Sequence, residues 1–286
     1  MPQSIAEAFA NLGKTPRDAV RAVQAISDPP ATQAEFRSWK QALSPGDESD
    51  ALERLALHYA MEDFAPQVDA LPVHPAVKDL IRKEFRTFRK PPATAGPALL
   101  VGTDPFIAAC KIATLRRFPA GPMDWLISGV PKSWIAKMPP AEVPAALWYI
   151  VKRFGGFRPA FYIHIATAPR NRSLVLEKEV RKAYYRMAKS LELQPAMKGI
   201  VCAGWFHDPA AVRDAPHLKA LNEPYLQHGG RLVTTVGEAT PESGFLKHNP
   251  ERRKAYEEGK QRIRLTLAMW PRSAAIAWAA RHPELE

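Results

Sequence analysis

From Pro159 onward, short runs of β-type residues alternate with helical segments, and this alternation constrains the fold more than any other feature of the chain. The β-type runs cover 160–166, 199–206, 231–237 and 264–270. The helical segments cover 174–193, 218–227, 250–258 and 273–280. Such alternation favours a sheet with helices packed on its faces, although the strands need not all be parallel. We therefore predict an α/β domain over residues 157–286.

The first part of the chain has a different pattern, because apolar residues recur at helical spacing over most of residues 1–90. We predict a helical N-terminal region there, with one helix opening at Thr15, Pro16 and Asp18. The Pro-rich stretch 91–97 is predicted to be a linker. Residues 98–156 are predicted to be a connecting region, with a short strand at 98–101, a helix over 105–118 and short aromatic-rich helices covering a sheet.

The charge balance limits the class of partner. The chain carries 40 Lys and Arg against 29 Asp and Glu, a formal net charge of +11. This field attracts anions such as nucleic acid, acidic membranes, nucleotide cofactors or acidic carrier proteins, and does not choose among them. The basic residues are scattered and accompany no nucleic-acid-binding motif, so we rank nucleic acid last.

The lengths of the apolar stretches and the charge pattern of the N-terminus bear on the compartment of the protein and on its contact with membranes. The longest apolar runs are far shorter than the roughly 20 residues needed to span a bilayer, and no basic patch precedes an apolar run at the N-terminus. We expect a cytoplasmic protein with no membrane partner. The two cysteines, Cys110 and Cys202, are expected to be buried thiols, and no metal site is predicted.

The ends of the predicted strands are the first place to look for chemistry, because backbone amides and polar side chains converge there in α/β sheets. On the first strand, His164 shares a face with Tyr162, opposite the aliphatic stripe of the same strand. A neutral imidazole there can act as a general base or donate one hydrogen bond within a packed layer. The structural role is the favoured interpretation.

The loop after this strand contains Arg170, Asn171, Arg172 and Ser173 and leads into a helix rich in Lys and Arg. Helix N-termini present unpaired amides, and guanidinium groups form planar forks for phosphate or carboxylate, so the loop suits an anion. An ordinary helix cap by Asn171 or Ser173 is an equally good interpretation.

The run FYIHIATAPRNRSLVLEKEVRKAYYRMAKSLELQPAMKGIVCAGWF, followed by HLKALNEPYLQHGGRLVTTVGE, resembles the core of GNAT-type N-acyltransferases. The resemblance covers residues 160–238 and implies a strand, a pyrophosphate-cradling loop, a helix, a strand, a second helix ending in Gly, and another strand. It implies that residues 170–173 meet the pyrophosphate of acyl-CoA or the phosphopantetheine of an acyl carrier protein. Tyr225 corresponds to the family's acid tyrosine. The loop lacks the glycines of the family pattern, which makes close backbone approach to phosphate harder.

Polar residues also follow the other predicted strands. His207 and Asp208 lie at a turn before Pro209, where both can exchange protons, and Asp208-Pro209 is also a common turn pair. Thr235 and Glu238 are placed at the end of the third strand and Arg272 at the end of the fourth. Glu238 can orient or deprotonate an amine and Arg272 can hold a carboxylate, although a capping or salt-bridging surface role is the favoured interpretation for both.

No P-loop, dinucleotide-binding glycine turn, nucleophile elbow or His-Glu-x-x-His helix occurs in the sequence. The leading hypothesis is acyl transfer from acyl-CoA or an acyl carrier protein to an amine. His164, His207 or Glu238 would be the base and Tyr225 the acid, and Asp208, Thr235 and Arg272 would bind substrate. The alternatives are another α/β enzyme or small-molecule-binding protein with its pocket at the strand ends, and a nucleic-acid or partner-binding protein.

Overall fold

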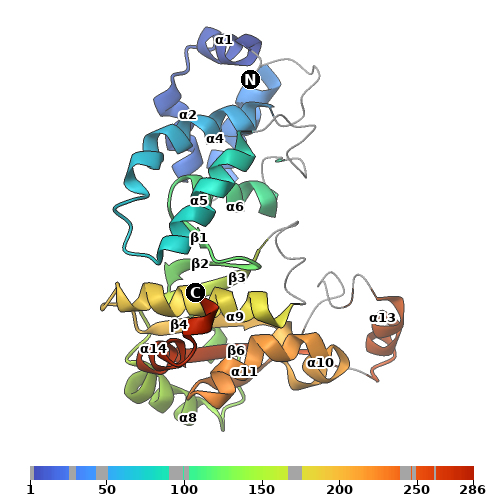
Figure 1. Cartoon of the computed structure of the whole chain (residues 1–286). Helices are drawn as coiled ribbons and strands as arrows, with labels where there is room; N and C mark the ends of the chain where they lie inside the picture. The colour runs from blue at the N-terminus through green and yellow to red at the C-terminus, as the bar shows by residue number, and fades with distance from the viewer. Residues whose placement is uncertain are drawn as a thin grey trace. The chain divides into compact units, whose positions relative to one another are not determined.

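The computed structural model describes residues 3–25, 30–42, 51–89, 99, 103–166, 176–238, 246, 249–260 and 262–286. The chain divides into two compact units (Figure 1). Unit 1 comprises residues 1–124 and 165–172, and unit 2 comprises residues 125–164 and 173–286. The mixed α/β class predicted from the sequence is confirmed, with six strands forming one mixed sheet in the described part of the chain.

Unit 1 is built mainly from helices. They are α1 (Gln3–Asn11), α2 (Pro16–Ala25), α3 (Pro30–Ala42), α4 (Ala51–Phe64), the short helix Ala65–Gln67, α5 (Pro75–Phe88) and α6 (Asp104–Ala113). Helix α2 packs on α4 and α6, and Phe36 and Phe106 contact each other in the interior with ring centroids 5.5 Å apart. The Thr15 amide donates to Asp18 Oδ2 at 2.8 Å, which confirms the predicted start of α2.

Unit 1 also contains strand β1 (Arg117–Pro119) and a buried ion pair beside it. The Arg117 Nε donates to Asp124 Oδ2 at 2.9 Å, and Arg117 Nη2 lies 2.8 Å from the same oxygen. Asp124 is fully buried, and the same guanidinium lies 3.5 Å from the Ile165 carbonyl oxygen. Arg117 therefore connects β1 with Asp124 and with the backbone of Ile165.

Unit 2 contains most of the sheet and the helices that cover it. Its strands and helices are β2 (Met123–Ser128, whose first two residues belong to unit 1), α7 (Lys132–Ile135), α8 (Val143–Trp148), the π-helix η3 (Tyr149–Phe154), β3 (Ala160–Ile165), α9 (Glu177–Glu192), β4 (Gly199–Gly204), η5 (Trp205–His207), α10 (Pro209–Asp214), η6 (Pro216–Leu218), α11 (Lys219–Gln227), β5 (Arg231–Glu238), α13 (Pro250–Glu257), β6 (Arg264–Pro271), α14 (Arg272–Ala280) and Pro283–Leu285.

The strand order is β1-β2-β3-β4-β6-β5. Strand β3 is parallel to β4, whereas β6 is antiparallel to both of its neighbours, β4 and β5. The strands β3, β4 and β5 therefore run in one direction, and their carboxyl ends lie at the same edge as the start of β6. We call this the strand-end edge.

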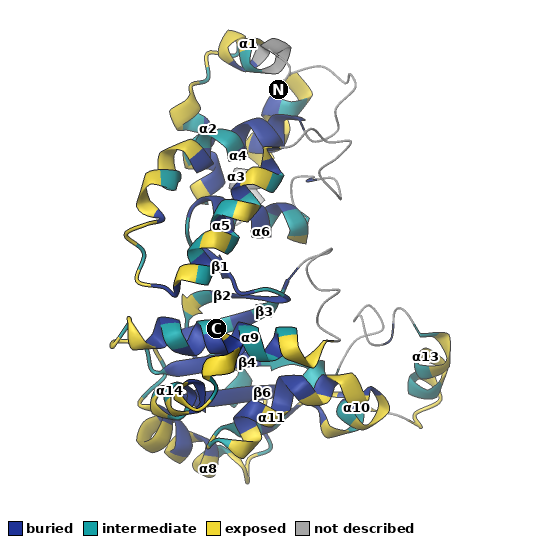
Figure 2. Cartoon of the chain, viewed as in Figure 1, coloured by how far each residue is buried: buried dark blue, intermediate teal, exposed yellow. Residues whose placement is uncertain are grey.

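Alternation along the strands gives the sheet of unit 2 two apolar faces (Figure 2). On one face, Val201, Leu267 and Met269 pack against residues of α8 and η3, including Ile150 and Phe154. On the other face, α9, α11 and α14 pack around the fully buried Trp270. Tyr184, Tyr225 and Trp278 stack around this tryptophan, with ring centroids 5.3–5.8 Å from its own.

Two differences from the sequence predictions concern residues 105–128. The predicted helix 105–118 ends at Ala113, because Leu115 adopts a left-handed backbone with φ 54° and β1 follows. Strand β2 was not predicted, since its apolar residues stand in a region rich in Pro and Gly. Most of the predicted strand 98–101 and the linker 91–97 lie outside the described residues.

Both cysteines are buried free thiols, as predicted. Burial raises the pKa of each thiol far above its ordinary value, so neither is a reactive thiolate. Among the described residues, no helix is long and apolar enough to cross a membrane.

Candidate functional site

The strand-end edge is formed where β3 and β4 stop pairing. Their parallel register runs through Phe161–Ile200, Tyr162–Val201 and Ile163–Cys202. Strand β3 continues to Ile165 and β4 to Gly204, and the last two residues of β4 stay paired with β6 through Ala203–Leu267 and Gly204–Thr266. In α/β sheets, ligands commonly bind at the carboxyl ends of neighbouring parallel strands.

Gly204 is the last residue of β4, and the Phe206 ring packs closely against its Cα atom. A Cβ atom at this position would lie 2.4 Å from the Phe206 ring. The absence of a side chain lets the chain turn directly into η5, which contains Trp205, Phe206 and His207 and packs against β6.

His164 lies at this edge on the same face as Tyr162. The two rings have centroids 5.1 Å apart, and the histidine is only partly buried. Tyr162 packs against the apolar cluster that contains Met138 and Val201, so it holds the histidine ring from one side. The expectation that His164 stands opposite the aliphatic stripe of β3 is thus confirmed, and the imidazole is placed where a solute can reach it.

His207 has a different environment, because it is 1% exposed and its ring packs against α11. Its Nδ1 lies 2.7 Å from Asn222 Oδ1. The Asn222 amide nitrogen donates to the carbonyls of Phe206 and Leu218, so its oxygen is the acceptor and Nδ1 carries the proton. Burial lowers the pKa of His207 to about 4, and the Asn222 hydrogen bond opposes this shift only in part. The Nε2 atom is buried without a hydrogen-bond partner in the described part of the chain.

Tyr225 is enclosed in the helical layer of α9, α11 and α14. It is fully buried, and its ring lies edge-on to Tyr184, with centroids 5.4 Å apart. Burial raises its pKa well above the ordinary value for tyrosine. The His207 ring lies 5.9 Å from it, so the structure brings these two predicted residues together, but inside the protein rather than at the strand-end edge.

Asp208 and Thr235 make only structural contacts. Asp208 Oδ1 accepts from the amides of Ala210 and Ala211 at 2.8 and 3.2 Å, which caps α10. Its Oδ2 accepts from the Arg264 amide at 3.1 Å and so fixes the start of β6. The Thr235 hydroxyl donates to the Leu265 carbonyl at 2.9 Å and is 1% exposed.

Glu238 lies at the strand-end edge and forms an ion pair with Arg262 at 3.0 Å. Both side chains are substantially exposed, at 37% and 52%, so this pair resembles an ordinary surface salt bridge.

Arg272 does not join the strand-end edge, and the expectation that it occupies a comparable strand end is wrong. Because β6 is antiparallel, its last residue, Pro271, pairs with Gly199 at the start of β4. Arg272 therefore lies at the opposite edge, where its Nη2 donates to the Leu191 carbonyl at 3.0 Å near the end of α9.

The predicted anion-binding residues Arg170, Asn171, Arg172 and Ser173 lie outside the described residues. The segment that contains them joins the end of β3 to the helix α9.

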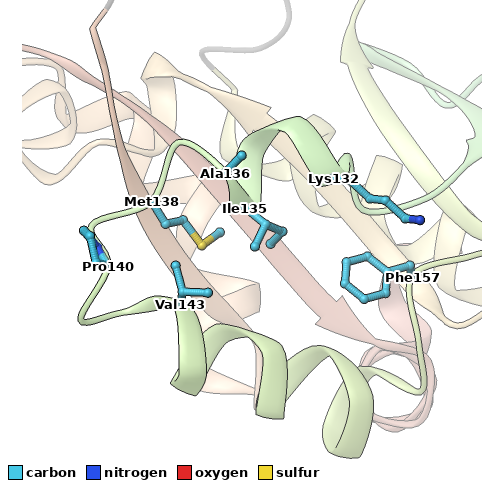
Figure 3. Close-up of a pocket in the computed structure, with 7 residues that line it drawn as sticks. All are labelled: Lys132, Ile135, Ala136, Met138, Pro140, Val143 and Phe157. Carbon is cyan, nitrogen blue, oxygen red and sulfur yellow. The ribbon is translucent and has the colours of Figure 1, made fainter.

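A groove opens on the face of unit 2 that carries α7 and α8 (Figure 3). Its volume is about 440 Å³, and Ile135, Met138, Val143 and Phe157 point into it. Lys132 is its one charged lining residue. The groove was not predicted, because the segments that line it are separated by η3 and brought together only by packing on the sheet.

Asn222 is the second feature that sequence reasoning missed. The signal that could have revealed it is a lone polar residue on the helix face otherwise made by Leu218, Leu221 and Tyr225. A buried polar side chain is normally hydrogen-bonded, and the hydrogen-bond partner of Asn222 Oδ1 is His207 Nδ1.

No family model, no curated protein and no solved structure matches this chain. In the described part of the chain, no group of three or more His, Cys, Asp or Glu side chains could hold a metal ion.

Proposed function

We propose that the chain is an N-acyltransferase that takes an acyl group from acyl-CoA or from the phosphopantetheine arm of an acyl carrier protein. The observation that carries the proposal is the parallel pair β3 and β4, joined through residues 166–176 and α9, whose pairing ends at Ile163 and Cys202 before either strand does. The phosphopantetheine arm is an extended chain with amide groups, which suits hydrogen bonding to main-chain groups at the carboxyl ends of two parallel strands.

The order of the elements supports the same proposal. Strand β3, helix α9, strand β4, helix α11 and strand β5 occur in this order, with η5, α10 and η6 between β4 and α11, and α11 is followed by Gly229, whose φ is 78°. This is the order implied by the resemblance of residues 160–238 to GNAT-type enzymes. Residues 170–173 include two arginines, and guanidinium forks suit the pyrophosphate of CoA.

In the proposed reaction the amine nitrogen attacks the thioester carbonyl carbon, and the C–S bond breaks as the C–N bond forms. We assign the base role to His164, since it is the partly exposed histidine at the strand-end edge, and it passes the proton to solvent. His207 and Tyr225 are enclosed, and the Glu238 carboxylate is held by Arg262. The departing thiolate is protonated by solvent.

Calorimetric titration of the full chain with CoA, with acetyl-CoA and with an acylated carrier protein tests the donor. We expect one of these donors to bind, and the double variant Arg170→Ala/Arg172→Ala to weaken binding at least tenfold. Arg213→Ala is the control for the loss of a positive charge elsewhere, because this arginine is 77% exposed on α10, and each single variant, Arg170→Ala and Arg172→Ala, is compared with it. Absence of binding by every donor would overturn the proposal.

Thiol release in the presence of a panel of amines tests the transfer step. Both cysteines are buried, so a thiol reagent reports released CoA with little background. His164→Gln should slow release at saturating donor without changing donor affinity. Equal rates for the variant and the wild type would contradict the assignment of His164 as the base.

A further inference from the structure

Helix α8 and the π-helix η3 carry an apolar surface that nothing in the described chain covers. Residues 143–151 read VPAALWYIV, which is nine apolar residues in succession. Ala146, Tyr149 and Ile150 are buried against the sheet. The residues between them point outward: Leu147 is 37% exposed, Trp148 58% and Val151 56%. We call these three outward residues the α8–η3 face.

This exposure is unusual, because a helix that is apolar all round is normally buried on all sides. Large exposed apolar patches mark binding surfaces for proteins, ligands or membranes. The groove in Figure 3 extends the apolar surface, since Val143 belongs to α8 and Ile135 and Met138 line the neighbouring wall.

The sequence on either side of this face is strongly one-sided in charge, and Lys152 and Arg153 lie on η3 itself. Within residues 129–158 the basic residues are Lys132, Lys137, Lys152, Arg153 and Arg158, and the single acidic residue is Glu142. All five cations are exposed. Among the described residues, none of the five is in an ion pair, so their charge is available to a partner.

We infer that the α8–η3 face docks on an anionic lipid surface. A partly exposed tryptophan beside aliphatic residues and flanking cations is the composition of interfacial segments, in which the apolar side chains enter the boundary between headgroups and acyl chains. Each cation close to an anionic bilayer adds attraction. The contact is peripheral, so it needs no span of about 20 residues. The proposal departs from our expectation of no membrane partner, which rested on the short apolar runs.

A second copy of the chain is a poorer occupant for this face. If two copies met at this face, the five cations and one carboxylate of one copy would lie opposite the same set of charges on the other copy. Like charges across an interface oppose association, whereas an anionic bilayer neutralises them.

Co-sedimentation of the full chain with lipid vesicles tests the inference. We expect binding to vesicles of phosphatidylcholine mixed with phosphatidylserine, much weaker binding to phosphatidylcholine alone, and a steep loss of binding with added salt. Trp148→Ser/Val151→Ser should abolish co-sedimentation. Lys152→Gln/Arg153→Gln should weaken it by roughly fivefold for each charge removed. Leu193→Ser is the matched control, because Leu193 is 52% exposed at the end of α9 and should leave binding unchanged.

Three results would overturn the inference. The first is that the wild type does not bind the mixed vesicles. The second is that the Trp148→Ser/Val151→Ser variant, with a wild-type circular dichroism spectrum, binds as well as the wild type. The third is that sedimentation equilibrium shows a dimer that this variant abolishes while vesicles bind neither protein, which would make a second copy the occupant. None of these measurements depends on the proposed acyl transfer.

Discussion

At His207 a single hydrogen bond and complete burial determine both the tautomer and the charge of the ring. Nδ1–H donates to Asn222 Oδ1, and the ring is enclosed between Phe206 and Tyr225. An imidazolium in this position would lose its hydration without gaining an anionic partner, so the neutral form is favoured in the folded protein. The residue therefore makes folding sensitive to acid.

The sign of this pH dependence follows from the pKa of His207, which burial lowers from 6.5 to about 4. Below pH 6.5 the unfolded chain binds a proton that the folded chain does not, so stability falls as the pH drops from 6.5 to about 4. We expect the free energy of unfolding to lose about 2 kcal/mol from this residue between pH 7 and pH 5. Urea denaturation at the two pH values should show a smaller loss in His207→Gln.

The control for this prediction is His217→Gln, because His217 is an exposed histidine nearby in the chain. It should keep the pH dependence of the wild type. If His207→Gln and His217→Gln show the same pH dependence as the wild type, the protonation of His207 does not contribute to acid sensitivity.

The two carboxylate oxygens of Asp208 accept hydrogen bonds from different elements, so their contributions to stability can be separated by substitution. Oδ1 caps α10 and Oδ2 accepts from the Arg264 amide. Asp208→Ala removes both contacts and should lower the free energy of unfolding by about 2 kcal/mol, roughly one for the cap and one for the buried amide. Asp208→Asn keeps the cap oxygen and should recover about half of this loss. Denaturant titration measures both, and equal losses in the two variants would contradict the division of roles.

At the scale of elements, the sequence predicted four of the six strands but not which strands are neighbours. The four strands β3, β4, β5 and β6 were expected within a few residues of their observed ends, because β-branched and aromatic runs are bounded by Gly and Pro. Pairing depends on packing between distant segments, so the insertion of antiparallel β6 between β4 and β5 leaves no local signal. That insertion moves Arg272 to the opposite edge, which explains why the predicted site was only partly assembled.

The start of β4 shows how closely these elements pack. Gly199 has φ 153°, and a Cβ atom there would lie 2.1 Å from the Trp270 carbonyl oxygen of the adjacent strand β6. Gly199→Ala should therefore destabilise the fold by about 3 kcal/mol or more, because the clash is with backbone that cannot rotate away.

Gly229→Ala is the matched control for Gly199→Ala. Gly229 also has a positive φ, at 78°, but its nearest neighbour is the Ala274 Cβ atom at 3.7 Å. This variant should lose only about 1–2 kcal/mol from backbone strain. Thermal or denaturant unfolding separates the two variants, and equal losses would show that the close approach of β4 and β6 adds nothing to the cost of the substitution.

At the scale of the whole molecule, the sequence predicted a helical first part and an α/β second part, and each compact unit has its own buried core. The buried pair Arg117 and Asp124 belongs to unit 1 alone, whereas the aromatic stack around Trp270 belongs to unit 2. Two separate cores permit two separate opening reactions, because local stability follows the contacts within each cooperative unit.

Asp124→Asn tests whether the two cores open separately. The substitution leaves the guanidinium of Arg117 buried without a counter-charge, which typically costs about 3–5 kcal/mol. We expect hydrogen exchange to accelerate in α4, α6 and β1 and to stay at the wild-type rate in β4, β6 and α14. Asp79→Asn is the control, because Asp79 is 74% exposed in a surface ion pair with Arg82 and should leave exchange unchanged throughout. If hydrogen exchange accelerated equally in β4 and β6, the two cores would unfold as one cooperative unit. Loss of a contact confined to unit 1 would then lower the stability of unit 2 as well.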